Sequence, residues 1–338
     1  MSTLAQRRNA RARARLNAVA RAALSEMGYE EVESPCLVPA PGMEPHLDAF
    51  RAPYHDQGGE RPLFLHTSPE YAMKRLLADG LERIFQLARV FRNGELSATH
   101  NPEFTLLEMY RAGADYRGIM ADAERVLESC ARSLCPAGEP RATRGGRVLD
   151  LRAPFEVLTM EQAFRQHAGI ELGGCAGDGG RLWAAARAAG LDAGPGGEGF
   201  EDVFFRIMLQ AVEPRLGQGR PTWLIDWPAP LAALARLRSD DPRWAERFEL
   251  YAGGLELANG FSELTDAAEQ RARLVEEQAL RARLSRSVYP LDERFLEAVG
   301  RMPPSGGIAI GVDRVLMLLT GAAAIDEVLL FPASGFWG

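Results

Sequence analysis

A polar loop between two strand-like stretches carries the first residues that can do chemistry. Arg92 follows an alternating stretch at 84–91, and His100 and Asn101 precede a returning strand at 103–110. A guanidinium offers phosphate oxygens a rigid fork of donors, so this arrangement predicts a grip on a polyphosphate. Arginine and asparagine are also common in hairpin loops, so an ordinary surface turn is the alternative.

A series of acids in an apolar stretch forms the second candidate. Glu249 and Glu256 are followed by Asn259, Phe261 and Glu263, and the last three share one face of a strand. Buried acids are costly unless a cation pairs with them. Glu249 and Glu256 are therefore candidate ligands of Mg²⁺, and Glu263 is a candidate partner of an ammonium group. An exposed strand with solvated acids would have the same spacing.

The third candidate is the glycine-rich segment 306–314, which ends in Asp313 and Arg314. Glycines let the backbone approach a ligand closely, and an arginine directly after them can contact phosphate. A tight turn from a strand into a helix, with a surface arginine, is the alternative.

Lysine usage singles out one more residue. Lys74 is the only lysine, and every other basic residue of the chain is arginine. Replacement on this scale is typical of a bias in base composition, so the one retained lysine is singled out as a candidate functional residue. Retention by chance is the alternative.

These residues must be brought together by a sheet and its loops. Helices are expected at 7–27, 68–78, 116–135, 201–216 and 266–285, and strands at 29–35, 84–91, 103–110, 221–228 and within 246–264, followed by a strand that passes into a helix at 306–319. Their irregular order favours an α+β fold, an antiparallel sheet flanked by helices, over a doubly wound parallel sheet. We expect one domain over 1–338, with a small helical insertion at about 136–200 where glycines accumulate.

Taken together, the segments resemble a known family. Residues 91–110 resemble motif 2 of the class II lysyl-tRNA synthetases, 306–314 resemble their motif 3, and 28–35 with the preceding helix resemble motif 1. Segments 67–76, which contains Lys74, and 256–266 look most like those of the elongation factor P–lysine ligases. The resemblance runs from about residue 8 to 331 except for the insertion, and it implies the class II catalytic fold without an anticodon-binding domain.

The resemblance also implies residue roles. Arg92 and Arg314 would be catalytic, and Mg²⁺ would be bound by Glu249 and Glu256. Contacts to ATP would come from Arg92, Asn93, Gly94, His100, Asn101, Glu249, Leu250, Gly311 and Arg314. The amino-acid pocket would be lined by Ser68, Pro69, Glu70, Glu108, Tyr110, Glu256, Asn259, Phe261, Glu263 and Ala309.

One position departs from the family pattern. The family has an acid that reaches adenine where this chain has Gly94, and Glu95 follows one place later. A shifted loop that brings in Glu95 would compensate for the missing acid. The alternative is that Glu95 is a solvated surface residue.

The implied activity is attack of an amino-acid carboxylate on the α-phosphorus of ATP, followed by transfer from the adenylate to a lysine side chain of elongation factor P. The amino acid would be (R)-β-lysine, or lysine with lower efficiency, and Ala309, where lysyl-tRNA synthetases have glycine, favours the β-amino acid. A lysyl-tRNA synthetase-like or asparagine-synthetase-like ligase and a catalytically inactive regulatory paralogue are the alternatives. The acids Glu70, Glu108 and Glu263 favour a cationic substrate over aspartate.

Composition limits the partners. A net charge of −7 opposes long-range attraction to nucleic acid, so no tRNA partner is expected. No apolar run reaches the roughly 18–20 residues of a membrane span, and four cysteines without CxxC spacing fit a reducing cytoplasm. The Arg- and Ala-rich N-terminus could mimic a transit peptide, but its apolar spacing favours a helix that leads into the fold.

That N-terminal helix has an apolar stripe on an arginine-rich surface. With the resemblance, this stripe predicts a homodimer through the helix and residues 30–35.

Overall fold

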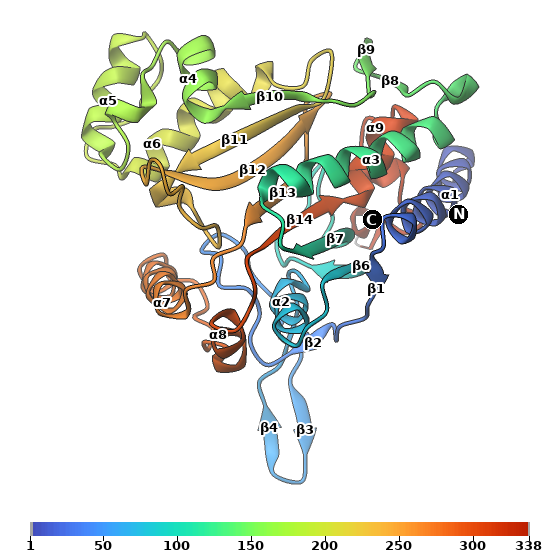
Figure 1. The fold of residues 1–338 in the computed structure, drawn as a ribbon, viewed down its shortest axis with the longest axis horizontal. Helices are drawn as coiled ribbons and strands as arrows, with labels where there is room; N and C mark the ends of the chain where they lie inside the picture. Colours follow the sequence, from blue (N-terminus) through green and yellow to red (C-terminus); the bar gives the residue numbers. More distant parts are fainter. Residues whose placement is uncertain (1–2, 337–338) are drawn as a thin grey trace.

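A computed structural model describes residues 3–336 and has a large sheet with helices on both faces (Figure 1). The helices are α1 (Leu4–Glu26), α2 (Glu70–Ala78), α3 (Tyr116–Leu134), α4 (Met160–Ala168), α5 (Gly179–Ala188), α6 (Phe200–Ile207), α7 (Ala267–Arg283), α8 (Glu293–Val299) and α9 (Val312–Thr320). The strands are β1 (Glu30–Glu31), β2 (Leu37–Val38), β3 (Tyr54–Asp56), β4 (Gly59–Arg61), β5 (Phe64–Leu65), β6 (Arg83–Phe91), β7 (Glu103–Ala112), β8 (Arg141–Arg144), β9 (Arg147–Asp150), β10 (Glu156–Thr159), β11 (Thr222–Pro228), β12 (Trp244–Ala252), β13 (Leu255–Ser262) and β14 (Ser305–Gly311).

Eight strands form the main sheet, in the order β1-β6-β7-β14-β13-β12-β11-β10. Only the two outermost pairs, β1 with β6 and β10 with β11, are parallel, and all the inner pairs are antiparallel. The predicted antiparallel sheet flanked by helices is therefore confirmed. The central strand β14 is the last in sequence, so the C-terminal segment completes the sheet between β7 and β13.

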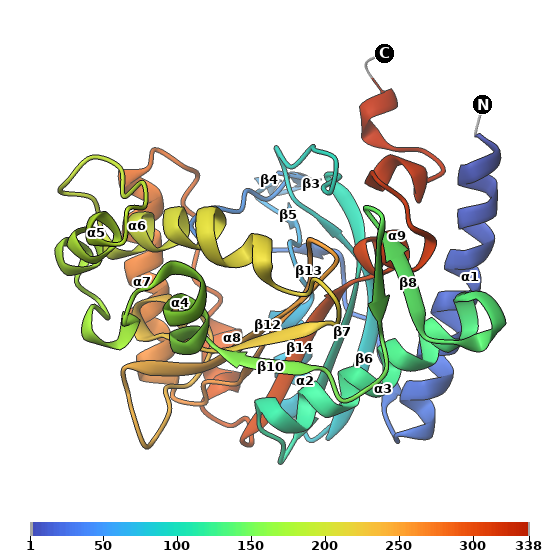
Figure 2. The same cartoon turned by 90° about the horizontal axis from the view of Figure 1, so that it is seen from above.

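Helices α1, α3 and α9 cover one face of the sheet with the largest apolar core (Figure 2). The stripe of α1 buries Leu16, Ala20 and Leu24 in this core, each at most 3% exposed. A helix that buries its apolar face within its own chain needs no second copy to cover it. The stripe therefore gives no support to the predicted dimer.

Residues 136–200 contain strands as well as the expected helices. A hairpin, β8 with β9, precedes β10, which adds to the edge of the main sheet beside β11. Helices α4, α5 and α6 then pack over β11 and β12 around a second apolar core. The sequence pattern did not show these strands because each has only four residues and all three have exposed positions.

Several predicted boundaries differ from the structure. The helix expected at 201–216 is α-helical only over Phe200–Ile207 and continues as π- and 3₁₀-helical turns to Arg215. The strand expected at 29–35 is regular only over Glu30–Glu31, because Pro35 closely follows and cannot donate to a neighbouring strand. Helix α2 begins at Glu70, with Pro69 as its N-cap, not at Ser68. No helix within residues 3–336 is long and apolar enough to cross a membrane.

Candidate active site

The sheet face away from α1 and α3 carries a cavity of about 800 Å³. Its floor is formed by two rows of residues that run across β12, β13, β14 and β7. Within each row, the residues on neighbouring strands are paired with one another. The first row is Glu249, Asn259, Ala309 and Glu108. The second row is Arg247, Phe261, Gly307 and Tyr110. Members of the two rows are two residues apart on each strand, so they share the face that lines the cavity.

Glu108 lies on this floor under the start of α2. Its Oε1 accepts a hydrogen bond from Ser68 Oγ at 2.6 Å, and its Oε2 accepts one from Tyr110 Oη at 2.8 Å. Burial, reinforced by the charge of Glu70, raises the pKa of Glu108 to about 8. Ser68 Oγ also accepts from the backbone N–H of Glu70, so one hydroxyl links the helix start to the acid.

A second group of charges lies between α2 and the end of β13. Lys74 Nζ is 2.6 Å from Glu70 Oε1 and 2.6 Å from Glu263 Oε2. Burial raises the pKa of Glu263 to about 7, with Lys74 opposing the shift and Glu70 adding to it. Glu263 Oε1 is buried without a hydrogen-bond partner among residues 3–336. A Cβ on Gly307 would come within 2.3 Å of this oxygen, so only glycine leaves it room at the cavity wall.

Arg92 places a positively charged hydrogen-bond donor in the same cavity as these carboxylates. Its guanidinium lies over the ring of Phe104, with Cζ 5.0 Å from the ring centroid. Nη1 is 3.8 Å from Glu95 Oε1, and Nε is buried with no partner in the described part of the chain. A buried guanidinium nitrogen without an acceptor is suited to a carboxylate or phosphate oxygen of a ligand.

Arg314, in the first turn of α9, reaches across the cavity rim. Its Nη1 donates to the backbone oxygen of Glu256 at 2.9 Å, and its Nη2 donates to His100 Nε2 at 2.6 Å. Burial and the charge of Arg314 lower the pKa of His100, which therefore accepts this bond as a neutral ring. With Nε2 accepting, the proton belongs on Nδ1, which is 2.8 Å from Ser97 Oγ.

Glu249 and Glu256, the predicted ligands of Mg²⁺, both line the cavity. Glu249 Oε1 accepts a hydrogen bond from Arg247 Nη2 at 2.6 Å, and its Oε2 accepts one from Tyr251 Oη, so a metal would share these oxygens with two protein donors. Burial and then the negative charge of Glu256 raise the pKa of Glu249 to about 7, so the two carboxylates repel each other. A divalent cation relieves such repulsion, and both groups are hard oxygen donors. Among residues 3–336 no group of three or more acidic, histidine or cysteine side chains is placed to hold a metal. Mg²⁺ on these two carboxylates would therefore need phosphate oxygens and water to complete its shell, as is usual at nucleotide sites.

Glu95 lines the cavity although the family pattern has its acid one place earlier. Gly94 adopts a φ of 84°, a left-handed conformation, and the next residue turns its carboxylate toward Arg92. Glu95 Oε2 is buried with no partner in the described chain, so it has an acceptor free for an exocyclic amine.

We expect Glu95→Ala to raise the KM for ATP roughly tenfold, the size of one lost hydrogen bond to a charged group, and to leave the KM for the amino acid unchanged. Steady-state ATP–pyrophosphate exchange measures both constants. Glu103→Ala, on the adjacent strand and 55% exposed, is the matched control. A KM for ATP equal to that of the wild type would make Glu95 a surface acid.

The structure brings together most of the predicted site residues. Those that line the cavity are Ser68, Glu70, Arg92, His100, Asn101, Glu108, Tyr110, Glu249, Glu256, Asn259, Phe261, Glu263, Ala309, Gly311 and Arg314. Pro69, Asn93, Gly94 and Leu250 do not line it. Leu250 alternates with Glu249 on β12 and therefore faces the core on the opposite side of the sheet. Asn101 is at the wall, but its Oδ1 accepts from Ala333 N and its Nδ2 donates to Glu103 O, which ties the C-terminal segment to the loop.

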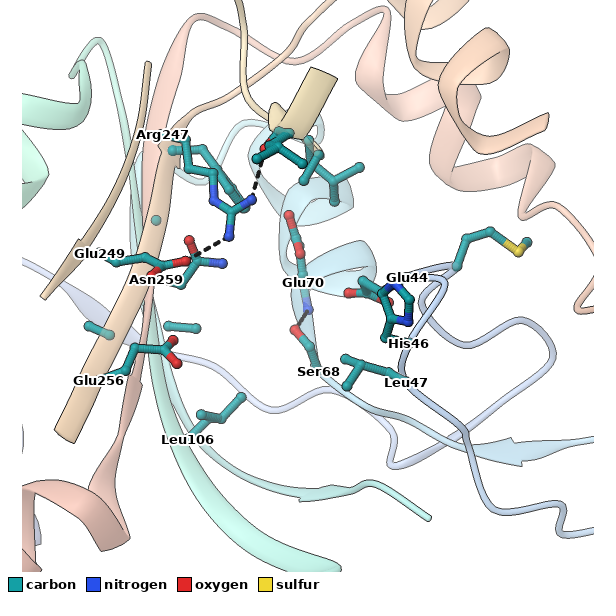
Figure 3. Close-up of a pocket in the computed structure, with 18 of the residues that line it drawn as sticks. Glu44, His46, Leu47, Ser68, Glu70, Leu106, Arg247, Glu249, Glu256 and Asn259 are labelled. Atoms are coloured by element: carbon teal, nitrogen blue, oxygen red, sulfur yellow. Dashed lines mark hydrogen bonds and ion pairs between the residues drawn. The ribbon is translucent and has the colours of Figure 1, made fainter. Parts of the chain in front are cut away.

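Other lining residues were not predicted. Figure 3 shows Arg247 beside Glu249 on the sheet side of the cavity, and Glu44 with His46 on the loop opposite. Arg247 is two residues from Glu249 on the same strand face, a spacing from which it could have been found. Glu44 sits in an irregular segment, whose approach to the cavity no periodicity reveals.

Comparison with known proteins places this site in a family. The family of class II tRNA synthetases (D, K and N) matches residues 1–335. Proteins named elongation factor P–(R)-β-lysine ligase from Salmonella typhimurium (strain LT2) and Salmonella paratyphi B are each 38% identical to the chain over 325 residues, which is 94% of this chain and 93% of theirs. With this match over nearly the whole length, the chain belongs to the class II tRNA synthetase family of the D, K and N group.

Proposed function

We propose that the chain is an AMP-forming ligase that activates (R)-β-lysine, or lysine, with ATP and transfers it to a lysine side chain of elongation factor P. The observation that carries the proposal is the charge layout of one cavity. Arg92 has an unpaired donor for a carboxylate or phosphate, and Glu263 has an unpaired acceptor for an ammonium. A diamino acid carries both of the groups that this pair of sites requires.

The chain's own residues suggest how the reaction is promoted. Arg92 and Arg314 would neutralise charge on the phosphates, and Arg92 would hold the amino-acid carboxylate near the α-phosphorus. When bound at Glu249 and Glu256, Mg²⁺ would supply further neutralisation of the phosphate charge. No side chain needs to act as a nucleophile, because the substrate carboxylate attacks. Catalysis would rest on positioning and electrostatics.

The choice of acceptor rests on the relatives and on charge. The Salmonella proteins named above carry elongation factor P in their names. The net charge of −7 opposes attraction to tRNA. Ala309 adds a methyl group between Asn259 and Glu108 on the cavity floor, where it can alter the fit of the amino-acid backbone by about 1–3 kcal/mol. This supports a β-amino acid.

The test is ATP–pyrophosphate exchange with aspartate, lysine and (R)-β-lysine, followed by transfer to elongation factor P or to tRNA-Lys. We expect exchange with the diamino acids and a mass increase on elongation factor P. Aspartate-dependent exchange would indicate an asparagine-synthetase-like ligase, and charging of tRNA-Lys alone would indicate a tRNA synthetase. A folded chain that binds ATP but exchanges with none of the three would be a regulatory paralogue.

We also propose a homodimer in the cytoplasm. The resemblance of residues 28–35 and the preceding helix to motif 1 supports the dimer, whereas the apolar stripe of α1 no longer does because it is buried within the chain. All four cysteines are free thiols, which supports a reducing compartment. Light scattering at micromolar concentration should give twice the chain mass of 37.0 kDa, and a value equal to one chain would refute the dimer.

A further inference from the structure

The only lysine of the chain lies behind the amino-acid end of the cavity. Lys74 is 1% exposed and is not among the residues that line the cavity. Its ammonium bridges Glu70 and Glu263, at 2.6 Å from each. Both of these carboxylates do line the cavity, so Lys74 touches the site through them.

Burying a carboxylate is costly, and Glu263 is 2% exposed. The ionisable groups that face Glu263 come from two elements. Helix α2 contributes Lys74 and Glu70, and β7 contributes Tyr110. The adjoining strand β14 presents Gly307, which has no side chain. Lys74 is therefore the one cation beside Glu263 among residues 3–336, and the negative charge of Glu70 opposes ionisation of Glu263.

The geometry points to Lys74 as a positioning residue that favours the ionised form of Glu263 and fixes its orientation, so that its free Oε1 can receive an ammonium of the substrate. Oε2 is taken by Lys74, and Oε1 is left without a partner beside Gly307. One oxygen of the Glu263 carboxylate thus pairs with Lys74, and the other is left for an ammonium group of the ligand. The identity of that ligand rests on the proposed function, whereas the role of Lys74 toward Glu263 does not.

Protonation supports this role. Burial lowers the pKa of the Lys74 ammonium, but Glu263 and Glu70 outweigh burial, and the net shift is upward. Lys74 therefore stays charged at every pH at which the cavity would be used. The pKa of Glu263 is about 7 even with Lys74 present, so without this cation the acid would be neutral at pH 7 and could not pair with an ammonium.

The structure also explains why the residue is a lysine. The chain contains 39 lysine and arginine residues, and all of them except Lys74 are arginine. An ammonium is a compact point charge that fits between two carboxylates, whereas a guanidinium is a planar fork that needs more space. Lys74 is enclosed on all sides, with Phe261 on one of them and its ring centroid 6.0 Å from Nζ.

A single lysine makes the first test unambiguous. Protein labelled with ¹⁵N-lysine should give one side-chain ammonium signal, which shifts with an inflection near pH 7 as Glu263 ionises. Glu263→Gln should remove that inflection. No substrate is needed, so this test holds whether or not the proposed function is right. A signal that does not respond to pH near 7, or that responds identically in Glu263→Gln, would overturn the inference.

The second test is kinetic. In Lys74→Met, the acidic limb of the pH profile of kcat/KM for the amino acid should move up by about one to three pH units, because the opposite charge beside Glu263 is gone. Glu70→Gln should move the limb down, since it removes a like charge. The Kd for ATP, measured without amino acid, should stay at the wild-type value in both variants and so reports an intact fold.

The outcomes separate the inference from the proposed function. If the wild type exchanges pyrophosphate with lysine or (R)-β-lysine and Lys74→Met keeps its pH profile, the function stands and the role of Lys74 is wrong. If the wild type exchanges with no diamino acid, the proposed function is wrong, and the ammonium signal alone decides the role of Lys74. The same signal decides it if Lys74→Met does not fold.

Discussion

Arg92→Ala should reduce kcat/KM for ATP–pyrophosphate exchange by about 10²–10³-fold, the loss typical of one preorganised donor aimed at developing charge. Arg92 directly follows β6 and lines the cavity, and its Nε has no acceptor among residues 3–336. Under the proposed mechanism that donor would pair with the reacting carboxylate and α-phosphate. Because this pairing strengthens as charge develops on the phosphate, kcat should fall along with kcat/KM.

Arg89→Ala is the matched control for Arg92. Arg89 lies on the same strand, is 52% exposed, and makes one ion pair of 3.7 Å with Glu103. An exposed pair of this kind contributes little, so stability and exchange should stay close to wild type. If Arg92→Ala exchanged at the rate of Arg89→Ala, the reacting centre would have to lie elsewhere in the cavity.

The sheet was predictable because most of its strands carry strong local patterns. Residues 84–91 and 103–110 alternate and are separated by a polar loop, and they became β6 and β7 with small changes at the ends. The strands β8, β9 and β10 lack such a pattern, since four residues give two repeats at most. Their place is determined by pairing with distant strands and not by their own composition.

The site was predictable to the extent that its residues alternate on strands. Asn259, Phe261 and Glu263 were expected on one face, and all three line the cavity. Leu250 was assigned to the site by resemblance alone, and the same alternation excludes its side chain from the cavity. The ion pair between Lys74 and Glu263 was not predictable from local patterns. It joins a helix to the end of a strand, and the two residues are 189 positions apart in the sequence.

The charged side chains that line the cavity come from several different sequence segments, so their combined protonation could not be predicted from any one motif. Glu70, Glu108 and Glu263 line the cavity together with Arg92 and Arg314, and Lys74 bridges Glu70 and Glu263 from behind the wall. Burial raises the pKa of Glu108 to about 8 and that of Glu263 to about 7, so these acids carry less negative charge when the cavity is empty than their number suggests. An amino acid with two ammonium groups favours the ionised forms of both acids, so its binding should be coupled to proton release at neutral pH.

Glu256→Ala should lower exchange by about 10²-fold at limiting Mg²⁺, with a higher Mg²⁺ concentration needed for half-maximal rate. Glu256 is one of the two carboxylates proposed to hold the metal, and its Oε2 also accepts a hydrogen bond from Arg314 Nη1 at 3.4 Å. Removing it leaves Glu249 alone and frees Arg314, so charge on the phosphates would be less well neutralised.

Glu246→Ala is the control, because Glu246 lies on the adjacent strand, pairs with Arg236 at 2.7 Å and does not line the cavity. Titration of the exchange rate with Mg²⁺ at saturating ATP compares the two variants. A wild-type Mg²⁺ requirement in Glu256→Ala would remove Glu256 from the metal site and leave Glu249 to be tested by itself.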